Sequence, residues 1–145
     1  MGRLAFSDAD QVVIMAAGVK IVGWADGEFC TVEQVSDGFT DVVGTDGEVV
    51  RSKTNDRRTT VTLKLLQTSI SNDILSAVHN ADIRARNGRG VFPFQIIDLQ
   101  GTTVVHAAQA WIVKAPDTSF DRSAKTKEWQ IRLAEATRFD GGNVI

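Results

Sequence analysis

The chain has 145 residues, of which 43% are hydrophobic and 23% charged, and its formal net charge at pH 7 is -2. This length predicts a single domain spanning residues 1–145, and this composition is typical of a globular protein and not of a disordered or fibrous one. The single cysteine, Cys30, excludes an internal disulfide framework and a zinc site built from cysteines.

The N-terminal part of the chain lacks the sequence features of a signal peptide and of a membrane-spanning helix. Its longest apolar run, from Val12 to Val19, is far shorter than the roughly 20 residues that a membrane-spanning helix needs. Asp8 and Asp10 precede this run, and acidic residues are not expected in a signal peptide. We therefore expect a protein that is made in the cytoplasm and has no membrane anchor.

The charges divide unevenly along the chain. Residues 1–50 carry two basic and nine acidic groups, which gives -7, whereas residues 51–145 carry fourteen basic and nine acidic groups, which gives +5. Two oppositely charged halves would let one copy attract the next head to tail, as in rings and filaments. Alternatively, the halves interleave in one fold and their charges mix on its surface.

Turn signals predict a mainly β fold. Asp-Gly pairs begin at Asp26, Asp37, Asp46 and Asp140, and the first three lie between extended segments, as hairpin turns do. The expected strands cover residues 11–15, 19–24, 28–35, 39–43, 48–52, 59–66, 92–99, 103–115 and 128–137. Eight or nine strands are enough to close a β-sandwich or barrel.

Two of these segments alternate strongly between apolar and polar residues. In 59–66 the alternation places Val61, Leu63 and Leu65 on a buried face and the polar residues between them on a wet one. In 128–137 it places Trp129, Ile131 and Leu133 inward and Gln130 and Arg132 outward. Both segments are therefore expected to lie with one face on the core.

One helix is expected over residues 71–87. Ser71 is the predicted N-cap, and Asp73 lies in the first turn, where the helix dipole favours a negative charge. Ile74, Leu75, Val78 and Ala81 fall on one apolar face, and Gly88 can end the helix. This amphipathic helix should cover one open edge or face of the sheet.

No residue pattern points to catalysis, to a metal or to a cofactor. The two histidines, His79 on the polar side of the helix and His106 in a strand, lack metal-ligand spacing. Cys30 has no neighbouring base and is interpreted as a small buried hydrophobe. We therefore expect a protein that is not an enzyme and that carries no cofactor.

The basic residues Arg51, Lys53, Arg57 and Arg58 cluster within eight positions. Nucleic-acid binding usually combines a basic domain with interleaved aromatic residues, but this chain is acidic and has no aromatic residue between Phe39 and Phe92. The cluster is either a solvated surface loop or, in the preferred interpretation, a contact to the acidic half of a neighbouring copy.

Three tryptophans, Trp24, Trp111 and Trp129, each lie in an extended segment beside apolar residues. We interpret them as anchors of the core or of an interface. The alternative is that they line the pocket of a small β-barrel that binds a ligand or a carbohydrate.

Several segments, in their order and spacing, resemble the tail tube proteins of contractile-tailed bacteriophages, which are similar to the tube protein of type VI secretion. These segments lie at residues 37–48, 51–73, 74–79, 97–102, 110–117, 128–131 and 141–143. The resemblance implies a small β-sandwich or barrel with a flanking helix and a long extended hairpin loop. It also implies hexameric rings that stack into a hollow tube.

In this family an extended loop reaches the adjacent ring, and both terminal segments bridge subunits. Carried onto this sequence, residues 39–58 are the candidate ring-to-ring element. Its expected polar contacts are Asp46, Glu48, Arg51, Lys53, Asp56 and Arg57. Thr31 and Glu33 are candidates for lining the lumen, because DNA that slides through should meet no continuous basic track.

The resemblance further implies a structural virion protein of the phage tail that works inside a contractile sheath during DNA ejection. The expected partners are further copies of this chain, the tail sheath protein, baseplate and tail terminator proteins, the tape measure protein, and genomic DNA held in the lumen without sequence specificity. A tail terminator or baseplate protein of the same fold is the alternative within this class.

Overall fold

A computed structural model describes residues 11–120, 122, 123 and 125–142 of the chain. The predictions that concern Asp8, Asp10, Asn143 and the bridging terminal segments lie outside these residues. The described elements are β1 (Val12–Ala16), β2 (Val19–Lys20), β3 (Cys30–Gln34), β4 (Phe39–Val43), β5 (Val49–Lys53), β6 (Thr59–Leu66), α1 (Ser71–Arg84), β7 (Phe92–Asp98), β8 (Val104–Lys114), β9 (Thr126–Leu133) and β10 (Thr137–Phe139).

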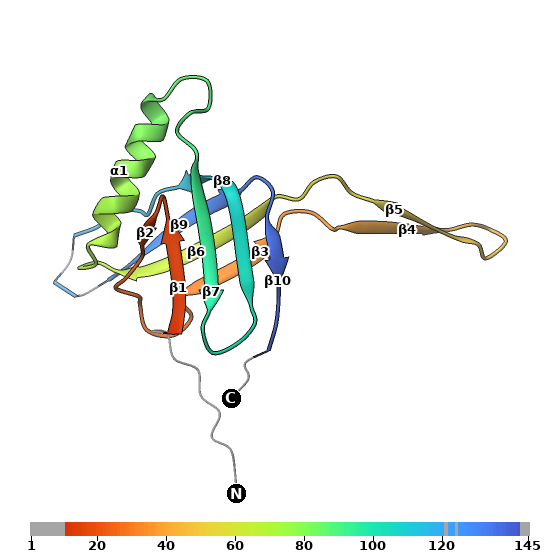
Figure 1. The fold of residues 1–145 in the computed structure, drawn as a ribbon, viewed down its shortest axis with the longest axis horizontal. Coiled ribbons are helices and arrows are strands. Elements are labelled where there is room, and N and C mark those ends of the chain that lie inside the picture. Colours follow the sequence, from red (N-terminus) through yellow and green to blue (C-terminus); the bar gives the residue numbers. More distant parts are fainter. Residues whose placement is uncertain (1–10, 121, 124, 143–145) are drawn as a thin grey trace, which may run out of the picture.

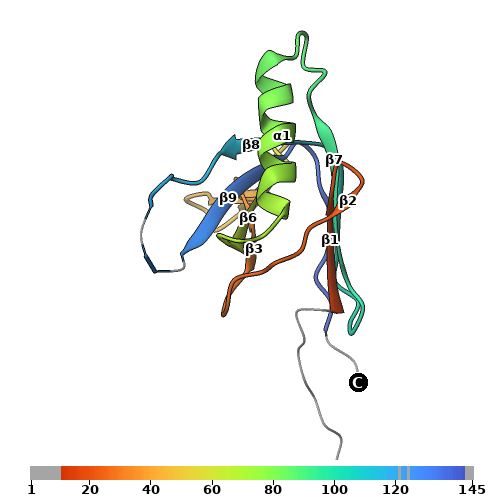
Figure 2. The ribbon, with the colours of Figure 1, turned by 90° about the vertical axis from the view of Figure 1, so that its left-hand side faces the viewer.

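The main sheet is antiparallel and has the strand order β2-β1-β7-β8-β9-β6-β3, with β10 also paired to β8. It folds over on itself into two layers (Figures 1 and 2). The front layer contains β1, β7, β10 and the first half of β8, and the back layer contains β9, β6 and β3. The predicted mainly β sandwich with one flanking helix and a long hairpin is therefore confirmed.

Strand β8 passes from one layer to the other through a β-bulge. Phe92 pairs with Ala110, but Phe94 pairs with Ala107, so β8 carries one extra residue between these pairs. Ala107 and Ala110 are both buried, whereas the two residues between them are exposed. A bulge bends its strand and increases its twist, which allows one long strand to serve both layers.

The predicted strand 128–137 is interrupted, so this prediction was wrong in its last part. Strand β9 ends at Leu133, and β10 begins at Thr137 after a bend. The register on β8 is kept, because Leu133 pairs with Ala110 and Thr137 pairs with His106. The bend lies opposite the bulge in β8, where the Ala134 N–H donates to the Gln109 carbonyl at 3.0 Å.

The core lies between the two layers and follows the predicted alternation. Val61, Leu63 and Leu65 of β6 are fully buried, and Val61 pairs with Ile131 while Leu63 pairs with Trp129. Trp129, Ile131 and Leu133 are buried as predicted. Apolar residues of the front layer complete the core, including Ile14, Phe94 and Val105.

The helix begins differently from the prediction. Ser71 is not the N-cap: Ile70 occupies that position without a side-chain cap, and Ser71 is the first helical residue. The Ser71 hydroxyl instead accepts a hydrogen bond from the Val22 N–H at 2.8 Å, and the Ser69 hydroxyl accepts the Ser71 N–H at 3.1 Å. The helix ends at Arg84, earlier than predicted, because Ala85 is extended with ψ at 150°.

The buried face of α1 is also rotated relative to the prediction. Its buried residues are Ser71, Asn72 and Leu75, whereas Ala81 is exposed. His79 is half-buried, and its Nδ1 atom is buried without a hydrogen-bond partner among the described residues, so its placement on the polar side was wrong. The rotation follows from the contacts of Ser71 and Asn72 to other elements. The helix thereby covers the open side between the two layers (Figure 2).

The segment predicted as strand 19–24 forms only the short β2. Gly23 has a φ of +79°, which stops regular strand structure, and Trp24 makes a single bridge to Leu65 of β6. This segment therefore links the front layer to the back layer. Cys30, the first residue of β3, is half-buried against the core, and burial raises the pKa of its thiol to about 12.

Candidate assembly surfaces

An arm formed by β4 and β5 projects from the body on the side opposite α1 (Figure 1). We use the term arm for residues 36–58. Its two strands pair from Phe39 with Lys53 at the base to Val43 with Val49 near the tip. The tip turn contains Asp46 and Gly47, and the positive φ of Gly47, +85°, explains why an Asp-Gly pair marked this hairpin in the sequence.

The arm continues the β3–β6 ladder of the body. The Val35 N–H donates to the Arg58 carbonyl at 3.1 Å, and the Thr54 N–H donates to the Gly38 carbonyl at 2.8 Å. Between these two hydrogen bonds, the returning leg from 54 to 58 is one residue longer than the outgoing leg from 35 to 38. A bulge at residues 55–57 therefore forms the joint between body and arm, and it sets the direction in which the arm leaves.

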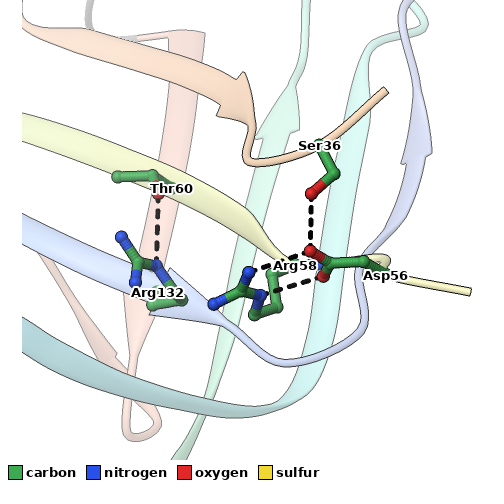
Figure 3. Close-up of polar contacts among 5 residues, drawn as sticks. All are labelled: Ser36, Asp56, Arg58, Thr60 and Arg132. Carbon is green, nitrogen blue, oxygen red and sulfur yellow. Dashed lines mark hydrogen bonds and ion pairs between the residues drawn. The ribbon is translucent and has the colours of Figure 1, made fainter. Parts of the chain in front are cut away.

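Asp56 lies in this joint and holds both legs together (Figure 3). Its carboxylate accepts two bonds from the Arg58 guanidinium, Nε to Oδ1 and Nη2 to Oδ2, both at 2.9 Å. On the outgoing leg, the Ser36 hydroxyl donates to Oδ2 at 2.6 Å. The hydrogen bonds from Arg58, and then that from Ser36, hold the pKa of the Asp56 carboxyl far below its usual range.

The remaining predicted contact residues of the arm lie on its exposed surface. The Arg51 guanidinium lies over the Phe39 ring at 4.7 Å from its centroid. The Arg57 Nη1 atom lies 3.3 Å from Glu135 Oε1 in an exposed ion pair. Asp46 Oδ1 accepts the Glu48 N–H at 3.2 Å within the tip turn.

The charged residues of this segment were predicted to contact another copy, and the structure shows that several of them also make contacts within their own chain. Asp56, Arg57 and Arg51 already have partners inside this subunit, and Glu48 and Lys53 are exposed. The sequence analysis did not predict that Ser36 and Arg58 hold Asp56 in the joint. Ser36 lies 20 positions before Asp56, so no local pattern indicates their contact.

Four valines form an exposed apolar arm tip. Val42 pairs with Val50 and Val43 pairs with Val49, so one valine pair lies on each side of the hairpin. These side chains are 56–68% exposed. A two-stranded hairpin is only marginally stable in water by itself, so this arm tip needs another surface to cover it. Two Val-Val pairs flanking an Asp-Gly turn were the signal available in the sequence.

The outer face of the back layer is polar, and we call it the polar face. Thr31 and Glu33, the predicted lumen residues, both lie there and are exposed. Thr31 is in register with Thr62 of β6, and Glu33 is in register with Thr60. The other outward residues of this face are Thr60, Thr62, Lys64, Glu128, Gln130 and Arg132.

The outer face of the front layer has the opposite character, and we call it the uncharged face. It is the face turned toward the viewer in Figure 1. On β1, β7, β8 and β10 its outward residues are Val13, Met15, Pro93, Gln95, Ile97, Val104, His106, Ala108, Thr137 and Phe139. None of these strand residues is Asp, Glu, Lys or Arg. Two charged residues lie at the border of the face: Lys20 of β2 pairs with Met15, and Glu135, in the bend before β10, shares a hollow with His106 and Thr137.

Comparison with known proteins assigns this chain to a family. Residues 12–139 match the family model described as "Bacteriophage PhiTE tail tube protein". The chain belongs to this tail tube family. The predicted resemblance is therefore confirmed, and the protein is a structural component of the phage virion tail.

A sequence relative agrees with this assignment, and two solved structures have a similar fold. The tail tube family protein is 30% identical over 148 residues to "Structural protein ORF10" of Pseudomonas phage KPP10, which covers 98% of this chain and 86% of that one. Its fold is similar to a chain in the structure of the anti-feeding prophage tube terminating cap, with a TM-score of 0.60, 8% identity and coverage of 96% and 94%. It is also similar to a chain of an extracellular contractile injection system sheath–tube complex, with a TM-score of 0.57, 10% identity and coverage of 91% and 90%.

Within the described ranges, no three His, Cys, Asp or Glu side chains gather as metal ligands would. Nor does that part of the chain hold a helix of the length and apolar character needed to cross a membrane. Two of the tryptophans, Trp129 and Trp24, line different hollows, and Trp24 packs against Phe29 at 5.0 Å between ring centroids.

Proposed function

We propose that this tail tube family protein is the repeating subunit of the tube. Six copies form a ring, and the rings stack into a hollow conduit for DNA ejection inside a contractile sheath. The observation that carries this proposal is the arm, because an exposed hairpin with an apolar tip gains a stable environment when a neighbouring copy covers it. The family assignment supports the same conclusion.

The arm is the ring-to-ring element of this proposal. Its charged residues, Asp46, Glu48, Arg51, Lys53, Asp56 and Arg57, act at two levels. Asp56, bonded to Ser36 and Arg58, fixes the angle of the arm, and Arg57 forms a separate ion pair with Glu135 of the body. Two exposed residues, Glu48 near the tip and Lys53 at the base, contact the adjacent ring and fix the register of stacking.

The lumen is lined by the polar face, with Thr31 and Glu33 among its residues. This face mixes hydroxyl, amide and both signs of charge, and Arg132 donates to Thr60 Oγ1 at 3.4 Å (Figure 3). A water-filled channel of this kind offers no continuous basic track on which DNA would be held. DNA and the tape measure protein would thus occupy the lumen without sequence-specific contacts.

The same fold serves proteins at the end of such a tube, and this gives the second candidate function. A chain of the anti-feeding prophage tube terminating cap has a similar fold. A terminator closes a tube and does not extend it, so it would form a single ring. The tube subunit would stack without limit, bind sheath along its length, and meet baseplate and terminator proteins at its two ends.

A shortened arm tests this function. Replacing residues 43–49 by Asn-Gly joins Val42 to Val50 through a two-residue hairpin. This change removes the tip turn and one of the two valine pairs, Val43 and Val49, and leaves the joint intact. We expect a folded subunit with an unchanged circular dichroism spectrum that forms no tubes in electron micrographs. Normal tubes from this variant would contradict the role of the arm. In the unmodified protein, long tubes would indicate a tube subunit, whereas isolated rings would indicate a terminator.

A further inference from the structure

We propose that the arm tip of one copy docks on the uncharged face of a second copy. This inference rests on the proposed function and deepens it, because it names the surface that receives the arm. It makes the valines, and not the charged residues of the arm, the main source of the contact.

The arm tip is suited to an apolar partner on both of its sides. Val42 and Val50 form one exposed pair and Val43 and Val49 the other, and the charged pair Asp41 and Arg51 lies one step nearer the base. The four valines lie between this charged pair and the tip turn that holds Asp46 and Glu48, so they can pack on an apolar surface when the hairpin lies along it. Burial of an exposed valine removes apolar area from water, which is the dominant favourable term in most protein association.

The uncharged face offers the matching surface. Cross-strand pairing places Val13, Ile97, Val104 and Phe139 in one continuous row across four strands. Phe139 is 62% exposed at one end of this row. Contiguous exposed apolar residues of this kind mark interaction sites on soluble proteins.

A small hollow lies next to this row. It has a volume of about 100 Å³ and is lined mainly by apolar atoms, with Met15, Pro93, Gln95 and His106 among its residues. Met15, Gln95, His106 and Thr137 form the second cross-strand row of the same face. A hollow of this size accepts a side chain and not a small-molecule ligand, for which pockets of several hundred Å³ are usual.

The pairing of these two surfaces explains open-ended growth. An apolar projection on one copy that fits a hollow elsewhere on the next is a heterologous contact, which leaves one unfilled surface at each end of the assembly. The polar face is the poorer acceptor, because the arm tip would bury Lys64, Glu128 or Arg132 without partners there. Each copy therefore carries a donor and an acceptor surface of the same chemistry.

Chemical cross-linking tests this contact in the full-length chain. Cys30 is replaced by Ala in all variants, and V50C is combined in one chain with Q95C on the uncharged face. The matched control combines V50C with T62C on the polar face. After assembly, a short bismaleimide is added, and the products are separated on a denaturing gel.

We expect a ladder of covalent multimers from V50C/Q95C and none from V50C/T62C or from either single variant. Tubes in electron micrographs together with no ladder from V50C/Q95C would overturn this inference and leave the proposed function intact. Covalent dimers from V50C alone would also overturn it, because arm tips would then meet each other. Absence of both tubes and ladders at every concentration would contradict the proposed function itself.

A second measurement uses nearly isosteric charge substitutions. Gln95 and Gln130 are both half-buried strand residues, one on the uncharged face and one on the polar face. We expect Gln95→Glu to raise the protein concentration needed for tube formation by about tenfold or more, and Gln130→Glu to change it by less than about twofold. Equal effects of the two substitutions, or a larger effect of Gln130→Glu, would overturn the inference.

Discussion

The carboxylate of Asp56 accepts hydrogen bonds from both Nε and Nη2 of Arg58, each at 2.9 Å, at the joint where the arm leaves the body. A bidentate pair between arginine and carboxylate fixes relative orientation as well as distance. Because the Ser36 hydroxyl also donates to this carboxylate, the pair joins the outgoing and returning legs of the arm. Three polar side chains therefore hold the bulge from which the arm leaves the body.

Asp56→Asn should loosen this joint without unfolding the body. The amide cannot accept the same set of bonds, so we expect the Thr54 N–H to exchange with solvent roughly tenfold faster, since local opening becomes easier. NMR measures this exchange rate of the Thr54 N–H. Asp140→Asn is the matched control, because Asp140 forms a similar exposed pair with Arg138, at 2.9 Å, and neither residue belongs to the arm. Unchanged protection of Thr54 in the Asp56→Asn variant would show that the pair does not hold the arm.

The same joint should respond to acid. The pKa of Asp56 is lower in the folded state than its unfolded value of about 4, so its contribution is present above pH 4 and is lost as the pH falls below that value. Protection of Thr54 should be constant between about pH 8 and pH 5 and then decline. In the Asp56→Asn variant this dependence should vanish.

Asn72 links the helix to the core through one side chain. Its Nδ2 donates to the Leu66 carbonyl at 2.9 Å, and its Oδ1 accepts the buried indole N–H of Trp129 at 2.9 Å. Asn72→Ala should lower the free energy of unfolding by about 1–3 kcal/mol, because it leaves that N–H unpaired. Urea unfolding measures this, with the exposed Asn80→Ala as control, expected within about 0.5 kcal/mol of the unmodified protein. The loss should be smaller in a Trp129→Phe background, and an equal loss there would contradict the assigned bond.

Gly23 allows close contact between two segments. A Cβ there would lie 2.5 Å from the Cβ and Oγ of Ser69, and the Ser69 hydroxyl donates to the Val22 carbonyl at 2.6 Å. Gly18 has the same φ of +79° but open space around it. Gly18→Ala should therefore cost only the backbone strain of about 1–2 kcal/mol, and Gly23→Ala roughly 1–3 kcal/mol more. Thermal or urea unfolding compares the two, and equal losses would show that the contact is not tight.

Cys30 should be an unreactive thiol in the folded protein. Burial raises its pKa from 9.0 to about 12, which lowers the thiolate fraction near neutral pH roughly a thousandfold. Reaction with a chromogenic disulfide reagent at pH 8 should be slow in the native state and fast after unfolding in guanidinium. Val50→Cys on the exposed arm tip, in the Cys30→Ala background, is the fast control. Equal native rates for the two thiols would contradict the burial of Cys30.

The sequence predicted those elements in which one short-range signal decides the structure. Strand β6 was predicted at its exact bounds because Val61, Leu63 and Leu65 alternate with polar residues, and β4 because an Asp-Gly turn follows it. The helix start was wrong because the Ser71 hydroxyl is used by Val22, which lies 49 positions away. No local pattern reveals such a contact.

The candidate site shows the same division. The hairpin from 39 to 58 and its charged residues were apparent in the sequence, since polarity and turn signals are local. The uncharged face was not, because it depends on which side of each strand faces outward once the two layers pair. A row such as Val13, Ile97, Val104 and Phe139 exists only through the register of four strands.

The most direct test of the assembly account is negative-stain electron microscopy of the purified, unmodified protein over a concentration series. The account predicts rings at low concentration and hollow tubes of increasing length at higher concentration, because stability of the assembly depends on subunit concentration. Single rings that never stack would favour the terminator, and a strictly monomeric protein at every concentration would contradict the account.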